Sequence, residues 1–104
     1  MKMRVDENGN PVPVLGIAGK GFVIDGTSAS DTSEALEPGI YRLCPSEATA
    51  DGVTYTAGED TDETPLEAEA TDTYLAVGAI ESIFVENGHK IAVLGGKLSV
   101  TPLT

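Results

Sequence analysis

The last third of the chain alternates short apolar runs with two-residue turns. Asn87-Gly88 separates Ile80–Glu86 from His89–Leu94, and both flanking segments are rich in β-branched residues. Asn-Gly is a strong hairpin signal, because a type I′ turn requires positive φ at both central residues. Gly95-Gly96 makes a second tight turn into Lys97–Thr101. The pattern therefore predicts a C-terminal three-strand antiparallel meander.

The same turns predict which side chains share a face, because side chains alternate along a strand. The register pairs Phe84 with Ile91 and Val93 with Leu98. One face is then predicted to be core and carries Ile80, Ser82, Phe84, Ile91, Val93, Leu98 and Val100. The opposite face carries Ile83, Val85, Ala92 and Leu94, together with Glu81, Lys90, Lys97, Ser99 and Thr101. An ordinary solvated face is more polar, so we expect another layer of the chain or another copy of the protein to cover it.

Further short elements precede this region. Ile40–Cys44, Val53–Ala57 and Tyr74–Val77 have strand character. Thr64-Pro65-Leu66-Glu67 matches a helix capping box with proline at the first helical position, which predicts one or two helical turns over Pro65–Ala70.

The first ten residues look like a leader and contain a turn signal, Glu7-Asn8-Gly9-Asn10. Pro11 and Pro13 bias their neighbours Val12 and Val14 toward extended geometry. We therefore expect an extended N-terminal arm over residues 1–14 and a single β domain over residues 15–104.

Composition narrows the fold class. The chain has 104 residues, with 12 glycines, 6 prolines, no tryptophan and 5% aromatic residues. Many turns and a core built from Val, Ile and Leu favour β structure over helices. We expect an all-β domain of about seven or eight strands, arranged as a small antiparallel sandwich or jelly-roll-like barrel.

The net charge of the chain argues against some classes of partner. Seventeen acidic residues against six basic ones give a formal net charge of −11. Binding to phosphates requires clustered lysine and arginine, and the six bases are scattered, so we expect no nucleic-acid partner. No segment approaches the roughly 20 apolar residues of a membrane span, and the start has no apolar signal-peptide core. We expect no membrane partner, and synthesis in a cytoplasm.

The acidic segment at residues 59–72 is the first candidate for chemistry. It contains Glu59, Asp60, Asp62, Glu63, Glu67, Glu69 and Asp72 and no base. Asp60, Asp62 and Glu63 are suitable oxygen ligands for calcium, but the spacing is not that of an EF-hand loop. The simpler interpretation is a solvated loop.

Other reactive residues have simple structural interpretations. His89 directly follows the Asn87-Gly88 turn, which is typical of a surface histidine. Cys44 is the only cysteine, and we interpret it as an inert, half-buried small residue. The segment 16–21 lacks the hydroxyl residue of a phosphate-binding loop. We expect no enzyme activity, no catalytic residue, no metal site and no cofactor.

One segment resembles a known class of protein. Leu36-Glu37-Pro38-Gly39-Ile40-Tyr41-Arg42-Leu43 is similar to a strand of small bacteriophage virion proteins, and residues 74–85, 88–94 and 96–103 resemble their closing strands. The likeness covers residues 27–103, although the acidic segment is longer and more charged than expected. It implies a structural protein of a phage or prophage particle, such as a head decoration or cement protein.

The resemblance implies location and partners. We expect the chain in the virion, made in the host cytoplasm, as a homo-oligomer (dimer or trimer) that contacts phage capsid or tail proteins. The predicted contact residues are Val12, Val14, Ile83, Val85, Ala92 and Leu94. The alternatives are a carbohydrate- or receptor-binding β module of a phage fibre or tail, which needs exposed aromatics, and a calcium-stabilised domain. Tyr41, Tyr55 and Tyr74 are the aromatics available for the first.

Overall fold

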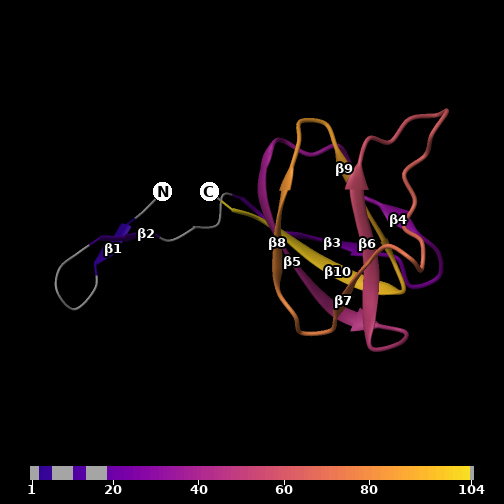
Figure 1. Ribbon diagram of the computed structural model, residues 1–104, viewed down its shortest axis with the longest axis horizontal. Coiled ribbons are helices and arrows are strands. Elements are labelled where there is room, and N and C mark those ends of the chain that lie inside the picture. The colour runs from indigo at the N-terminus through magenta and orange to yellow at the C-terminus, as the bar shows by residue number, and fades with distance from the viewer. Residues whose placement is uncertain (1–2, 6–10, 14–18, 104) are drawn as a thin grey trace.

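Two four-stranded antiparallel sheets pack against each other (Figure 1). They are seen in a computed structural model that describes residues 3–5, 11–13 and 19–103. The β10 sheet has the strand order β3-β10-β5-β8, and the β9 sheet has the order β4-β9-β6-β7. The strands are β3 (Phe22–Asp25), β4 (Asp31–Thr32), β5 (Gly39–Ala48), β6 (Gly52–Gly58), β7 (Thr73–Ala76), β8 (Glu81–Val85), β9 (Lys90–Leu94) and β10 (Gly96–Leu103). The predicted all-β antiparallel sandwich is confirmed.

The N-terminal residues form a pair of strands of their own. β1 (Met3–Val5) is antiparallel to β2 (Pro11–Pro13), with Arg4 opposite Val12. Two short segments of the predicted arm, Met3–Val5 and Pro11–Pro13, therefore pair with each other. Its boundary at Val14 lies outside the described residues.

The predicted C-terminal meander is wrong, although its three strands exist. β8 and β10 lie in the β10 sheet, where β5 separates them, and β9 lies in the other sheet. Gly88 has a φ of 79°, but no described residue other than glycine has positive φ, so Asn87 cannot complete a type I′ turn. The Gly88 amide instead donates to the carbonyl of Leu36. The turn carries the chain from one sheet to the other.

The crossing changes which side of β8 faces the core. β8 pairs with β5, which places Phe84 opposite Ile40 and Val85 opposite Gly39. Val85 is fully buried, whereas Phe84 and Ile80 are 65% and 66% exposed. The predicted core face is thus right for Ile91, Val93, Leu98 and Val100, which are buried, and reversed for β8.

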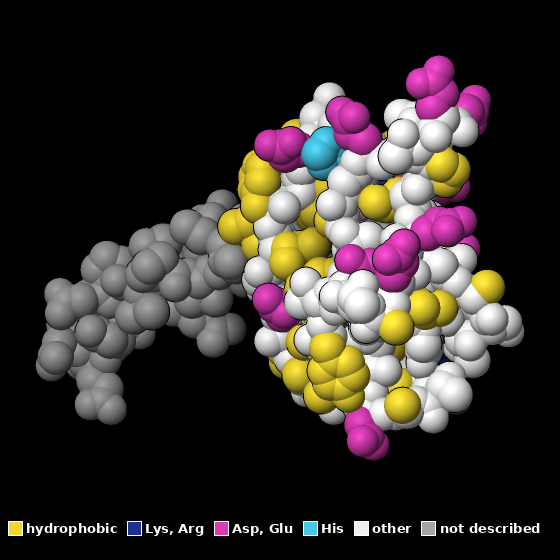
Figure 2. All heavy atoms as spheres, turned by 45° about the vertical axis from the view of Figure 1, so that its right-hand side comes forward, with side chains coloured by type: hydrophobic (Ala, Val, Ile, Leu, Met, Phe, Trp, Pro, Cys, Tyr) yellow, Lys and Arg dark blue, Asp and Glu magenta, His cyan; other side chains and the backbone are white. Residues whose placement is uncertain are grey.

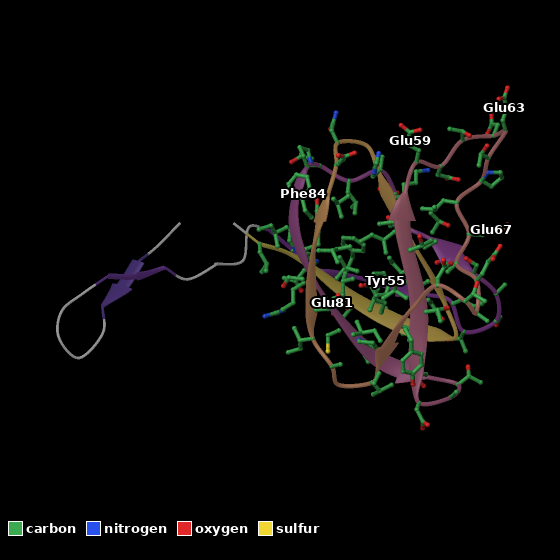
Figure 3. The ribbon with its side chains drawn as sticks, in the orientation of Figure 1. Tyr55, Glu59, Glu63, Glu67, Glu81 and Phe84 are labelled. Carbon is green, nitrogen blue, oxygen red and sulfur yellow. The ribbon has the colours of Figure 1, made fainter. Side chains whose placement is uncertain are left out.

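The core lies between the sheets and is mostly aliphatic, as the composition predicts. Its members are Ile24, Tyr41, Leu43, Val53, Tyr55, Leu75, Val85, Ile91, Val93, Leu98 and Val100. Tyr55 of the β9 sheet lies near Glu81 of the β10 sheet (Figure 3), and burial, followed by the interaction with Glu81, raises the pKa of Tyr55 to about 12. The two residues approach each other from the two sheets at the β8 edge.

Two glycines let the backbones approach closely where the chain changes sheets. Gly26 and Gly96 are joined by a backbone hydrogen bond of 2.8 Å, from the Gly26 amide to the Gly96 carbonyl. A Cβ at Gly96 would lie 2.1 Å from the carbonyl oxygen of Glu47, and one at Gly26 would lie 2.2 Å from that of Val93. Any larger residue at either position would push these strands apart.

Candidate interaction surfaces

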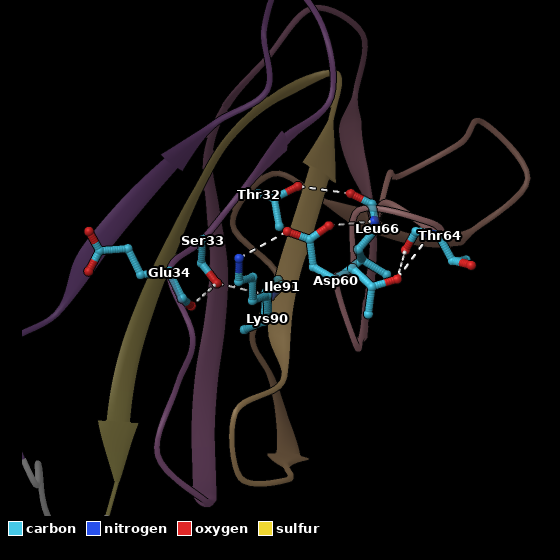
Figure 4. Close-up of polar contacts among 9 residues, drawn as sticks. Thr32, Ser33, Glu34, Asp60, Thr64, Leu66, Lys90 and Ile91 are labelled. Atoms are coloured by element: carbon cyan, nitrogen blue, oxygen red, sulfur yellow. Dashed lines mark hydrogen bonds and ion pairs between the residues drawn. The ribbon is translucent and has the colours of Figure 1, made fainter.

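The acidic segment packs against the protein and is not a free loop. We call residues 59–72 the acidic strap. The hydroxyl of Thr32 donates to the carbonyl of Leu66 over 2.9 Å (Figure 4). The amide of Ala68 donates to Oγ of Ser30 over 2.8 Å. Lys90 Nζ lies 2.9 Å from Oδ2 of Asp60. These bonds hold the strap on β4 and β9.

The strap covers part of the outer face of the β9 sheet. Ala92 points away from the core, between the inward-facing Ile91 and Val93, yet it is fully buried. Ala68 of the strap is also buried but is not a member of the core cluster. At Ala92, the apolar second face predicted from the sequence is therefore covered by another layer of the same chain, the acidic strap.

The predicted helical turns at Pro65–Ala70 are absent, since the structure assigns no helix to these residues. The amide of Leu66 donates to Oδ1 of Asp60 over 2.9 Å, and the amide of Ala68 donates to Ser30. These amides are satisfied by the side chains of Asp60 and Ser30, and the capping-box sequence forms no helix.

The carboxylate of Asp60 is bound within this packing by two groups of the same chain. The Leu66 amide and, next, the Lys90 ammonium hold the pKa of Asp60 below its ordinary value of 3.8. The described part of the chain holds no group of three or more His, Cys, Asp or Glu side chains arranged to bind a metal ion. The calcium alternative therefore has no assembled ligand set among these residues.

The outer face of the β10 sheet has a different surface. One row across the sheet is apolar: Phe84 lies opposite Ile40, and Ile40 lies opposite Leu103. In another row Cys44 pairs with Ser99, and Ser99 pairs with Val23, which is 58% exposed. Alternation along each strand places all of these side chains away from the core.

Charges on this face lie at its centre and at one end. Arg42 lies opposite Ser82 and Thr101, between the apolar row and the Cys44 row, and it is exposed. No ion pair joins Arg42 to an acid of the described residues. Lys97 is 3.2 Å from Glu47, and this contact, followed by the charge of Asp25, raises the pKa of Lys97.

The predicted contact residues lie in several different environments. Val85 and Ala92 are buried within the chain, so assigning them to an interface is wrong. Ile83 and Leu94 are half-buried, and Ile83 packs against the core. The side chains of Val12 and Val14 lie outside the described part of the chain.

Sequence reasoning missed the large apolar side chains that are exposed. They are Val23, Tyr74, Val77, Ile80 and Phe84. Pairing β8 with β5 instead of β9 would have placed Phe84 outside. The hydrophobic pattern does not decide which side of this strand faces the core, because Ile80–Val85 is apolar on both faces.

Two adjoining grooves lie near the start of β5, each of about 410 Å³. One is lined by β3 and residues 31–36, and the other by residues 19–20, 35–41 and 102–103. They share Phe22, Ala35 and Leu36. Their acids are Asp31, Glu34 and Glu37, and neither groove contains a histidine or a cysteine.

The histidine, the cysteine and the tyrosines that the sequence offers as candidate site residues lie in different parts of the structure. His89 Nε2 is 3.6 Å from Glu86 at the β8–β9 turn, as expected for a turn-flanking histidine. Cys44 is half-buried on the outer face of the β10 sheet, and its sulfur lies 3.9 Å from the carbonyl of Pro45. Tyr41 and Tyr55 are 7% and 6% exposed, whereas Tyr74 is largely exposed.

The fold and surfaces define a class, a two-sheet antiparallel β sandwich in which the strap covers part of one outer face and, among the described residues, no such segment lies over the other. Within the described residues, no helix is both long and apolar enough to cross a bilayer. Comparison with protein-family models, curated proteins and solved structures finds no match to this chain.

Proposed function

We propose that this chain is a non-enzymatic structural protein of a phage or prophage particle. It decorates or stabilises the capsid through self-association and contacts with the capsid lattice. The proposal rests on the sequence resemblance over residues 27–103 and on the character of the surface, which suits a subunit that buries area on assembly.

One observation carries the proposal. The strap covers part of the outer face of the β9 sheet, while the outer face of the β10 sheet carries the exposed Phe84 in one row with the half-buried Ile40 and Leu103. An exposed aromatic beside an arginine is typical of the energetically important residues of protein interfaces. This face supports a protein partner better than a small-molecule substrate.

The alternative, a carbohydrate- or receptor-binding module, receives less support. Such a module needs several exposed aromatic rings. Two of the three tyrosines, Tyr41 and Tyr55, are in the core. Tyr74 and Phe84 remain, but they lie on different sheets.

Mass spectrometry of purified particles tests the proposal. Particles are induced from the bacterium that encodes the chain and banded by density. We expect the chain to co-sediment with the major capsid protein at a fixed ratio. The variant Phe84→Ser, which changes an exposed side chain, should fold normally but be depleted from particles. Absence of the wild-type chain from every particle fraction would refute the proposal.

A further inference from the structure

The two broad surfaces of the sandwich differ in charge: the strap is acidic, whereas the outer face of the β10 sheet carries charges of both signs. On the strap, Glu59, Asp62, Glu63, Glu67 and Glu69 are all exposed. Figure 2 looks onto this side, where acidic side chains are spread over the surface and basic ones are almost absent. Figure 3 shows Glu63 and Glu67 on the strap side and Phe84 on the far side of the sandwich.

The other surface presents the charge that complements the strap. Arg42 is exposed at the middle of the outer face of the β10 sheet, and no described acid forms an ion pair with it. Lys90 and Lys97, by contrast, each pair with an acid of this chain. Arg42 therefore offers a guanidinium that can form a bidentate contact with a carboxylate of another molecule.

A symmetric contact, in which two copies meet through the same surface, is unfavourable for either surface. A two-fold contact brings the same patch of both copies together. Packing one β10 sheet on another would bring two Arg42 side chains to the same interface, and packing strap on strap would oppose two sets of carboxylates. Like charges that face each other across an interface weaken it.

We propose that copies of this chain associate head to tail, with the acidic strap of one copy docked on the outer face of the β10 sheet of the next. Arg42 then meets the strap carboxylates. Phe84 and its row meet the exposed apolar side chains of Tyr74, on β7, and Val77, which directly follows β7. The proposal deepens the self-association part of the proposed function and rests on it.

A head-to-tail contact has a consequence for assembly. Each copy uses two different surfaces, so every copy that joins leaves one surface of each kind free. Such a contact closes into a ring if the rotation between copies allows it, and otherwise extends as a stack. The contact also weakens with salt, because exposed charges are screened.

Light scattering behind size-exclusion chromatography tests the proposal with the full chain. At about 0.02 M salt the wild type should associate as its concentration rises, and at about 0.5 M salt it should dissociate, because the screening length falls severalfold. Arg42→Glu should weaken association by about tenfold or more, since it replaces an attraction by a repulsion. Glu63→Lys/Glu67→Lys should weaken it similarly.

Mixing the two variants gives the decisive readout. The strap of the lysine variant complements the face of Arg42→Glu, so the mixture should associate where each variant alone does not. Thr49→Glu/Ala50→Glu is the matched control for Arg42→Glu. It changes the net charge by the same amount at the exposed β5–β6 turn and should associate nearly as the wild type does.

Three outcomes would overturn the inference. These are a monomer at every concentration and salt, association that Arg42→Glu leaves unchanged, or a variant mixture that stays monomeric. The test on purified particles is independent, because a chain that binds only the capsid lattice would still co-sediment with particles.

Discussion

Lys90 Nζ lies 2.9 Å from Oδ2 of Asp60, and this ion pair joins the acidic strap to the outer face of the β9 sheet. The other carboxylate oxygen of Asp60 accepts from the Leu66 amide within the strap. One side chain therefore both shapes the strap and fastens it.

Replacing this side chain should loosen the strap while the sandwich stays folded. In Asp60→Ala the amides of Leu66 and Ala68 should exchange with deuterium about tenfold faster or more, because local opening becomes easier. Asp62→Ala, which removes an exposed acid, is the control and should change little. If both amides exchange as slowly in Asp60→Ala as in the wild type, Asp60 does not hold the strap.

Acid should release the strap in the same way. The pKa of Asp60 is lower in the folded protein than its ordinary 3.8, so its stabilising contribution is complete above that pH. The contribution is lost as the pH falls below 3.8 through the folded pKa. Limited proteolysis of the strap against pH should show cleavage rising below this value. Asp60→Ala should be cleaved readily at all pH values, and a pH-independent wild type would contradict the prediction.

Gly96→Ala should destabilise the sandwich strongly. The new Cβ would lie 2.1 Å from the Glu47 carbonyl oxygen, so β5 and β10 must separate at their junction. We expect a loss of about 3 kcal/mol or more in urea unfolding, the range of severe backbone and packing defects. Gly58→Ala is the control, because its Cβ would make an ordinary contact of 3.7 Å with Leu66. Its effect should stay within about 1 kcal/mol.

Thr54→Val should stabilise the protein. The Thr54 hydroxyl is buried and, among the described residues, makes no hydrogen bond. Removing a buried unpaired hydroxyl while keeping the shape of the side chain should raise the free energy of unfolding by about 1 kcal/mol. Thr32→Val is the matched comparison and should lower it by about 1 kcal/mol, since the Thr32 hydroxyl donates to Leu66. A destabilised Thr54→Val would indicate a hydrogen-bond partner for that hydroxyl.

Alkaline unfolding should depend on Tyr55. Burial, together with the interaction with Glu81, raises the pKa of Tyr55 to about 12. Above pH 10 the unfolded chain loses this proton while the folded chain keeps it, so stability falls as the pH rises toward 12. Tyr55→Phe should show a weaker decline over the same range in denaturant titrations. An unchanged decline would exclude Tyr55 as its source.

The strands could be predicted from the sequence, and their partners could not. Glycines at positions 88 and 95 do mark turns with positive φ. Whether such a turn makes a hairpin or a crossing depends on distant contacts, such as the bond from Gly88 to Leu36. The pattern of Ile83, Phe84 and Val85 allows either face inside, so one wrong pairing reverses the whole strand.

The candidate surfaces were partly predictable for the same reason. The hydrophobic pattern predicts a second apolar layer over Ala92, but the composition of the acidic strap predicts a solvated loop. That composition hides Leu66 and Ala68, whose backbone groups bond to Thr32 and Ser30 more than thirty residues away. Separations of this kind leave no periodic signal. The outer face of the β10 sheet, with Phe84 on it, emerges only when β8 is placed beside β5.

The position of β10 determines when this protein can begin to fold. β3 and β5 do not pair with each other, because β10 lies between them and pairs with both. Until β10 has left the ribosome, the nascent β3 and β5 lack their shared neighbour, and the sheet cannot assemble. Assembly of this sheet therefore waits for β10 and is dominated by contacts distant in sequence, which form slowly and leave strand edges open meanwhile.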